Sequence, residues 1–226
     1  MLVRQLFIGK EKMIETYCSK NKNALYEKAA CIISKSLRES LKSKEFAALG
    51  LCGGRNVEDI YSMLSSKRLR WDKIHTFLTD ERVFEKTNSK LIEKHFGSLS
   101  HKNLHLYRNS IEDYRNQLSD IGNLFDFLVL SAGEDGHIAS IFPNHSSVLD
   151  NGENYILVQN SPKLPSTRIS ISRNIVKSAS AGMLLFIGEE EKQAYSNFIN
   201  EKVSEEECPA KIARRINRLY VLTDLL

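Results

Sequence analysis

The segment LSAGEDGHIASIFP, residues 130–143, carries the side chains best suited to acid–base chemistry. Asp135 and His137 lie two residues apart, directly after a strongly apolar run. The unperturbed pKa of histidine lies close to neutrality, so its ring can accept a proton at working pH, and a nearby carboxylate can orient that ring. A histidine that only caps a turn is the alternative. Because the flanking glycines let the backbone approach a ligand closely, we favour a catalytic role for both residues.

A second cluster, Cys52-Gly53-Gly54-Arg55-Asn56, has the composition of an anion site. It follows another apolar run and precedes a segment with helical spacing. A Gly-Gly turn that opens a helix exposes unpaired backbone N–H groups at the positive end of the helix dipole. An ordinary tight turn is the alternative for this pair of glycines taken alone.

Three further clusters contain charged side chains. Asp80-Glu81-Arg82 follows an apolar run, Arg168 ends the segment KLPSTR, and Lys192 ends the segment GEEEK. Arginine and lysine from separate loops can converge on one phosphate, arginine through a planar fork and lysine as a point charge. Each charge taken alone fits an ordinary surface position, so the prediction depends on whether the fold brings them together.

The hydrophobic pattern supplies elements that would do so. Apolar runs of strand length occur at residues 46–52, 73–79, 125–130 and 183–187, with shorter ones at 155–159 and 168–172. Helical spacing occurs at 24–41, 57–66, 88–96, 110–118 and 190–199. This alternation predicts an α/β fold: one three-layer α/β/α domain over residues 1–226, with a mostly parallel, Rossmann-like sheet. Ligands of such sheets bind outside the carboxyl ends of the strands.

Composition excludes several other classes of protein. The net charge of +4 is too small to indicate nucleic-acid binding, and we interpret Arg214, Arg215 and Arg218 as a solvated helix face. The four cysteines form no C-x-x-C pair or zinc pattern, so we expect reduced thiols and a cytoplasmic location. No apolar segment is long enough to span a membrane. We therefore predict no metal, no membrane partner and no nucleic acid.

Taken in order, the motifs resemble those of the 6-phosphogluconolactonase family, which shares a fold with glucosamine-6-phosphate deaminases. GEDGHIASIFP (133–143) resembles the family's Gly-x-Asp-Gly-His-x-Ala-Ser-Leu-Phe-Pro almost residue for residue. Trp71 followed by TDERV (79–83) and Thr87-Asn88 resembles its tryptophan, Asp-Glu-Arg and Ser-Asn stretch. KLPSTRIS (163–170) resembles Lys-x-Pro-x-x-Arg-Ile-Thr, and GEEEK (188–192) resembles the Gly-x-x-x-Lys helix start. Several motifs in the family's order are more specific than any one of them.

The resemblance implies hydrolysis of 6-phosphoglucono-1,5-lactone to 6-phosphogluconate in the pentose phosphate pathway, without metal or organic cofactor. It implies that His137 is the general base for an attacking water and that Asp135 orients it. Arg168 and Lys192 match the family's phosphate-binding cations, together with the Gly53-Gly54 turn. Asp80 and Arg82 would contact the polar substrate, and Arg82 could stabilise the negative charge that develops on the carbonyl oxygen.

The chain departs from the family pattern at the phosphate turn. The usual Ser-Gly-Gly-Ser-Thr-Pro is replaced by residues 52–57, CGGRNV, so that Arg55 and Asn56 would have to substitute for two hydroxyl donors. Two alternatives follow. A deaminase-type isomerase shares Asp-Gly-His, but it would need a glutamate in the stretch that reads ASIFP here (139–143). A non-catalytic sugar-phosphate sensor would fit the altered turn, although it has no need for a general base.

Overall fold

An eight-stranded sheet forms the centre of the computed structural model, which describes residues 1–8, 12–99 and 102–225. β1 runs antiparallel to β2, and every other neighbouring pair in this sheet is parallel. In spatial order the strands are β1 (Leu2–Ile8), β2 (Lys12–Cys18), β11 (Arg218–Thr223), β10 (Ala181–Phe186), β7 (Phe127–Ser131), β3 (Ala47–Leu51), β4 (Ile74–Leu78) and β6 (Leu104–His105).

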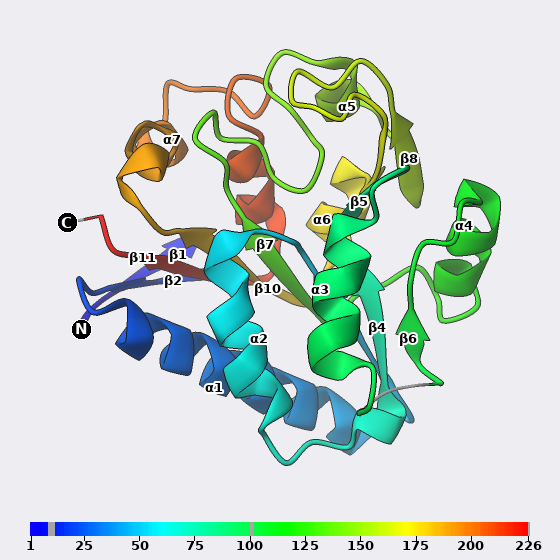
Figure 1. The fold of residues 1–226 in the computed structure, drawn as a ribbon. Coiled ribbons are helices and arrows are strands. Elements are labelled where there is room, and N and C mark those ends of the chain that lie inside the picture. The colour runs from blue at the N-terminus through cyan, green and yellow to red at the C-terminus, as the bar shows by residue number, and fades with distance from the viewer. Residues whose placement is uncertain (9–11, 100–101, 226) are drawn as a thin grey trace.

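The central strands are apolar on both faces because helices cover both. Every residue of β3 and β10 is buried, as parallel strands between two helical layers require. The long helix α1 (Lys22–Ser43) lies on one side of the sheet, and α6 (Arg173–Ser178) and α7 (Lys192–Ile199) lie on the other (Figure 1). The predicted three-layer α/β/α fold with a mostly parallel sheet is therefore confirmed.

The remaining helices flank this framework. They are α2 (Glu58–Ser65), α3 (Thr87–Phe96), α4 (Ile111–Ser119) and α5 (Ser146–Leu149). Short polar side chains start several helices: Asn21, Ser110 and Ser172 accept hydrogen bonds from the first-turn N–H groups of α1, α4 and α6. No described helix has the length and apolarity that crossing a membrane demands.

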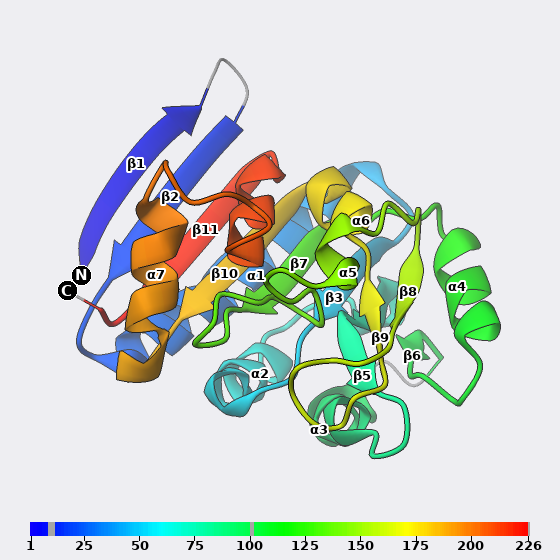
Figure 2. The ribbon, with the colours of Figure 1, turned by 90° about the horizontal axis from the view of Figure 1, so that it is seen from above.

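A second, three-stranded antiparallel sheet packs beside the first (Figure 2). It consists of β5 (Asp80–Arg82), β9 (Arg168–Ile171) and β8 (Tyr155–Val158). Residues 80–82, which follow an apolar run in the sequence, pair with β9, and this pairing places Arg82 directly opposite Arg168. This pairing brings together two charged clusters that lie 86 positions apart in the chain.

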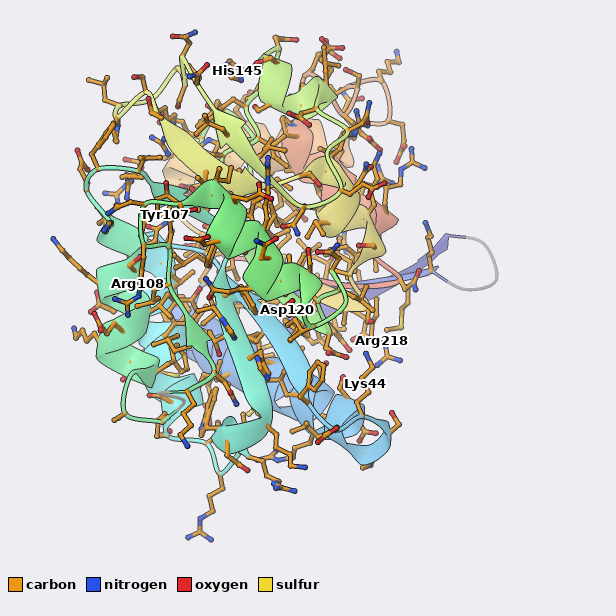
Figure 3. The ribbon with its side chains drawn as sticks, turned by 90° about the vertical axis from the view of Figure 1, so that its right-hand side faces the viewer. Lys44, Tyr107, Arg108, Asp120, His145 and Arg218 are labelled. Atoms are coloured by element: carbon orange, nitrogen blue, oxygen red, sulfur yellow. The ribbon has the colours of Figure 1, made fainter. Side chains whose placement is uncertain are left out.

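The C-terminal arginines do not share a helix face, so that interpretation is wrong. Arg214 and Arg215 end a 3₁₀ helix, Pro209–Arg215, and form ion pairs with Glu201 and Glu205. Arg218 instead begins β11. It lies near Lys44 (Figure 3), at the amino end of the parallel strands. The carboxyl ends of these strands point towards the polar motifs.

Candidate active site

A pocket of about 350 Å³ lies at the carboxyl ends of the central strands. The turns that follow β3, β7 and β10 contribute to its wall, as do β5 and the loop before β9. Most of the predicted binding residues line it, namely Gly53, Gly54, Arg55, Asn56, Asp80, Arg82, His137 and Arg168. Figure 2 looks onto the side of the molecule where β10 leads into α7 and where α2 and α3 begin.

His137 is held by its neighbour Asp135. One carboxylate oxygen of Asp135 accepts a hydrogen bond from the backbone N–H of His137 at 3.1 Å and also contacts the ring nitrogen Nδ1. Burial alone would raise the pKa of Asp135, but the hydrogen bonds and charge of His137, aided by Lys163, lower it to about 2. The carboxylate is thus ionised at neutral pH and can only accept, so Nδ1 carries the hydrogen.

The other ring nitrogen of His137, Nε2, is then the basic one whenever the ring is neutral. It forms no hydrogen bond with any residue in the described parts of the chain, and the ring lines the pocket. The ring of Phe142 lies 4.8 Å from it, centroid to centroid, and supports one side. This arrangement, with one nitrogen anchored and the other available in a pocket, is what general-base chemistry requires.

Gly133 and Gly136, which lie on either side of Asp135 in the His137 turn, are each required for a different structural reason. A Cβ atom on Gly133 would lie only 2.1 Å from Cε1 of His137, so a side chain there would displace the ring. Gly136 has a φ of +84°, and a Cβ atom would meet the sulfur of Cys208 at 2.9 Å. The turn is closed by two backbone hydrogen bonds of 2.9 Å between Gly133 and residues 136 and 137. Both glycines therefore fix where the imidazole sits.

Asp80 and Arg168 lie deep in the pocket wall. The Asp80 carboxylate accepts hydrogen bonds from the Ser140 hydroxyl at 2.8 Å and from the Asn88 amide at 3.2 Å. Burial raises the pKa of Asp80, while the Ser140 hydrogen bond and the charge of Arg168 oppose the rise. Burial likewise lowers the pKa of Arg168. These two opposite charges stabilise each other away from water.

Arg168 also organises the loop in front of it. Its Nε and Nη2 atoms donate to the backbone carbonyls of Lys163, Leu164 and Pro165 at 3.0–3.1 Å, and its guanidinium lies 5.4 Å from the Phe142 ring centre. Nη1 is the one guanidinium nitrogen without a hydrogen-bond partner in the described chain. The predicted phosphate-binding residue therefore also holds the 163–165 loop against the pocket.

Arg82 and the phosphate turn meet through Asn88. Nη1 of Arg82 lies 3.5 Å from Oδ1 of Asn88, and a Cβ atom on Gly53 would lie 1.8 Å from that same oxygen. Gly53 is thus required for close packing, whereas Gly54, with a φ of +123°, is required by the backbone. Among the described residues, no acceptor is assigned to the N–H groups of these two glycines. They remain open to an anion.

The two residues that replace the usual hydroxyl donors tie this turn to a second glycine turn. The side-chain amide of Asn56 donates to the carbonyl of Ile187 at 2.7 Å, and the Arg55 guanidinium forms an ion pair with Glu190 at 3.0 Å. Gly188, with a φ of +118°, shapes the second turn. In the structure both side chains therefore contact the protein, Asn56 through a backbone carbonyl and Arg55 through an exposed ion pair.

Lys192 lies outside the pocket lining. Its side chain is 74% exposed and forms an ion pair with Glu189 at 3.6 Å. It is the one member of the predicted binding set that the structure does not bring into the pocket wall, so its contact with phosphate stays a prediction.

Five charged or amide side chains of the pocket lining are absent from the set predicted from sequence: Asn88, Glu134, Lys163, Glu190 and Glu191. Lys163 forms ion pairs with Glu134 at 3.0 Å and with Asp135 at 3.9 Å, which places a cation beside the imidazole. Its position in the KLPSTRIS motif is a usable signal. The others also lie within quoted motifs, namely Thr87-Asn88, 133–143 and 188–192, but the sequence does not show that their side chains meet in one pocket.

Cys52 also lines the pocket, but burial raises the pKa of its thiol to about 12, which rules it out as a nucleophile at neutral pH. All four cysteines are free thiols. In the described parts of the chain, no group of three histidine, cysteine, aspartate or glutamate side chains is arranged to hold a metal ion.

Comparison with known proteins gives a consistent result. Residues 20–221 match the family model described as glucosamine-6-phosphate isomerases/6-phosphogluconolactonase. A 6-phosphogluconolactonase of Borreliella burgdorferi is 34% identical over 199 residues, which cover 80% of this chain and 85% of that protein. The crystal structure of a 6-phosphogluconolactonase from Shewanella baltica superposes with a TM-score of 0.81 at 22% identity, covering 95% of this chain and 98% of the other.

Proposed function

The chain belongs to the glucosamine-6-phosphate isomerase/6-phosphogluconolactonase family, and we propose that it hydrolyses 6-phosphoglucono-1,5-lactone to 6-phosphogluconate. The observation that carries this proposal is the His137 ring, anchored through Nδ1 and open through Nε2 in a pocket that also holds cations. The relative from Borreliella burgdorferi bears the name of this activity and supports the choice of substrate. The reaction would belong to the pentose phosphate pathway.

At the carbonyl end, Nε2 of His137 removes a proton from water while the water oxygen attacks C1 of the lactone. The carbonyl oxygen becomes negatively charged, and in this proposal Arg82, a cation of the pocket lining, stabilises it. When the tetrahedral intermediate collapses, the bond between C1 and the ring oxygen breaks, and the imidazolium returns its proton to that oxygen. Asp135 holds the ring in the required tautomer and stabilises its charged form throughout.

At the phosphate end, the open N–H groups of the Gly53-Gly54 turn and the side chains of Arg55 and Arg168 supply the binding groups. The turn lies ahead of α2, so the dipole of that helix adds positive potential. Anchoring the phosphate uses binding energy far from the reacting bond to place the carbonyl beside Nε2. In this proposal, Asp80 contacts sugar hydroxyls from the pocket floor.

The deaminase alternative remains within the same family, and a glucosamine-6-phosphate deaminase of Staphylococcus haemolyticus is 25% identical to the chain. We favour the lactonase because residues 139–143, which directly follow the His137 turn, contain no carboxylate. Ammonia release from glucosamine 6-phosphate without acceleration of lactone opening would reverse this choice.

The test compares wild type with His137→Ala on freshly prepared 6-phosphogluconolactone, after subtraction of the spontaneous rate. Loss of a general base lowers kcat by roughly 10²–10⁴-fold, and KM changes less because the base acts in the transition state. Titration with 6-phosphogluconate is the folding control, since the phosphate contacts remain. Equal rates for the two proteins would favour the non-catalytic sensor.

A further inference from the structure

The charges around the pocket balance to zero. Its lining contains four cationic side chains, Arg55, Arg82, Lys163 and Arg168, and an equal number of carboxylates, Asp80, Glu134, Glu190 and Glu191. A phosphate monoester carries between one and two negative charges near neutral pH. The pocket therefore attracts such a ligand more strongly when a cation gives up the carboxylate to which it is paired.

The cations differ in how firmly they are held. Arg168 is buried and bonded to three backbone carbonyls, and Lys163 is shared between Glu134 and Asp135. Arg82 has no carboxylate partner in the described chain. Arg55 has one ion pair, with Glu190 at 3.0 Å, and the two side chains are 88% and 65% exposed. Exposed pairs of this kind are weak, so Arg55 is the paired cation that exchanges its partner most easily.

Resting on the proposed function, we propose that Glu190 is a specificity-determining residue: it pairs with Arg55 in the free protein, and the substrate phosphate displaces it. Arg55 belongs to the same turn as the open N–H groups of Gly53 and Gly54, so a phosphate bound there lies beside the guanidinium. The Glu190 carboxylate then turns towards solvent.

This exchange makes the response to ligands depend on their charge. A phosphorylated lactone gains Arg55 by replacing Glu190, whereas an unphosphorylated lactone has no anionic group to do so. The competing carboxylate also limits how tightly the phosphorylated product binds, because Glu190 recaptures Arg55 as the product leaves. Glu190 is thereby expected to lower affinity for phosphorylated ligands and to leave binding of neutral lactones unchanged.

Glu190→Gln tests this, with Asp72→Asn as the matched control. Asp72 also forms one exposed ion pair, with Arg70 at 3.3 Å, and its replacement frees a cation in the same way, but neither residue lines the pocket. We expect Glu190→Gln to tighten 6-phosphogluconate binding by about two- to fivefold, the size of an exposed ion pair, and to lower KM for the phosphorylated lactone more than it changes kcat. Asp72→Asn should change neither quantity.

A second comparison isolates the exchange itself. In an Arg55→Met background, Glu190→Gln should lose most of its effect, because there is no longer a cation to release. An undiminished effect in that background, or equal effects of Glu190→Gln and Asp72→Asn, would overturn the proposal. Calorimetric titration measures binding without turnover, so a wild type that binds 6-phosphogluconate but opens no lactone would refute the proposed function separately.

Discussion

The Asp135 carboxylate makes two contacts with one residue, the backbone N–H and the ring Nδ1 of His137, and this double contact defines the site at the scale of single residues. Sequence predicted this pair because both partners lie within three positions and share a recognisable motif. The pairing of Arg55 with Glu190 could not be predicted, because the two residues are far apart in the chain and meet only when two glycine turns come together. The sequence allowed prediction of a contact between neighbouring residues of one motif, but not of a contact between two loops that are distant in the chain.

Replacing Asp135 should remove a pH-dependent contribution to stability. The pKa of Asp135 in the folded protein is about 2, below its ordinary value of 3.8, so the stabilisation is fully present above about pH 4 and is lost as pH falls towards 2. Its upper limit is roughly 2 kcal/mol, reduced by solvent screening because the side chain is 31% exposed. Urea unfolding of wild type and Asp135→Asn from pH 3 to 7 measures it. A constant difference between the two proteins across this range would contradict the assignment.

Arg168 is expected both to hold the 163–165 loop in place and to bind the substrate phosphate. Arg168→Lys keeps the charge but cannot reproduce the planar fork that reaches the carbonyls of residues 163–165. We predict at least a tenfold lower kcat/KM for the phosphorylated lactone, and increased proteolysis of the loop. The two substrates separate these effects: a loss that is equal for phosphorylated and unphosphorylated lactone would show that Arg168 acts through the loop and not through phosphate.

At the scale of elements, the glycine turns that follow β3, β7 and β10 position many of the residues that line the pocket. Sequence predicted these strands, and the helices α2 and α7 that follow β3 and β10, because apolar runs and helical spacing alternate there; it did not predict α5, which follows β7. It missed β1 and β2, in which Arg4 and Glu15 interrupt the apolar residues, and it also missed β11 and the short β6. It could not predict that β5, β8 and β9 form a separate sheet. Strand partners far apart in sequence leave no mark on local spacing.

Gly133→Ala should impair catalysis more than folding. The added methyl group would lie 2.1 Å from the His137 ring, which must move away from its place beside Asp135. We expect kcat to fall by at least tenfold, since small displacements of a catalytic group are costly. Gly152→Ala is a control at a distance from the pocket, where the nearest atoms belong to side chains at 3.0–3.1 Å. Similar kinetics for Gly133→Ala and wild type would show that the ring position is not limiting.

At the edge of the sheet, a pair of histidines gives the stability of the fold a second pH dependence, which is unrelated to catalysis. His75 on β4 and His105 on β6 are joined by a 2.9 Å hydrogen bond, and Gln117 bonds the far side of His105 at 2.9 Å. Burial lowers the pKa of both rings in the folded protein. As the pH falls, the unfolded chain therefore binds protons before the folded protein does, and the free energy of unfolding decreases below about pH 6.5. His75→Gln should therefore lose less stability than wild type between pH 7 and 5. An identical loss in thermal melts would contradict this.

For the molecule as a whole, the parallel sheet separates two ends with different tasks. The amino ends of the strands are fixed by structural ion pairs such as Lys44 with Asp126 at 2.7 Å, while the carboxyl ends carry the pocket. This polarity was predictable from the alternation of elements, and with it the side of the molecule on which the motifs meet. The neutral charge balance of the pocket was not, because it depends on which carboxylates fold in beside the cations.

The most direct test of the account is the rate at which the wild-type protein opens freshly prepared 6-phosphogluconolactone, followed by coupled oxidation of the 6-phosphogluconate formed. One pocket that holds both the base and the phosphate-binding groups predicts acceleration far above the spontaneous rate, and a much smaller kcat/KM for the same lactone without phosphate. No acceleration above the spontaneous rate, or equal acceleration of both lactones, would contradict it.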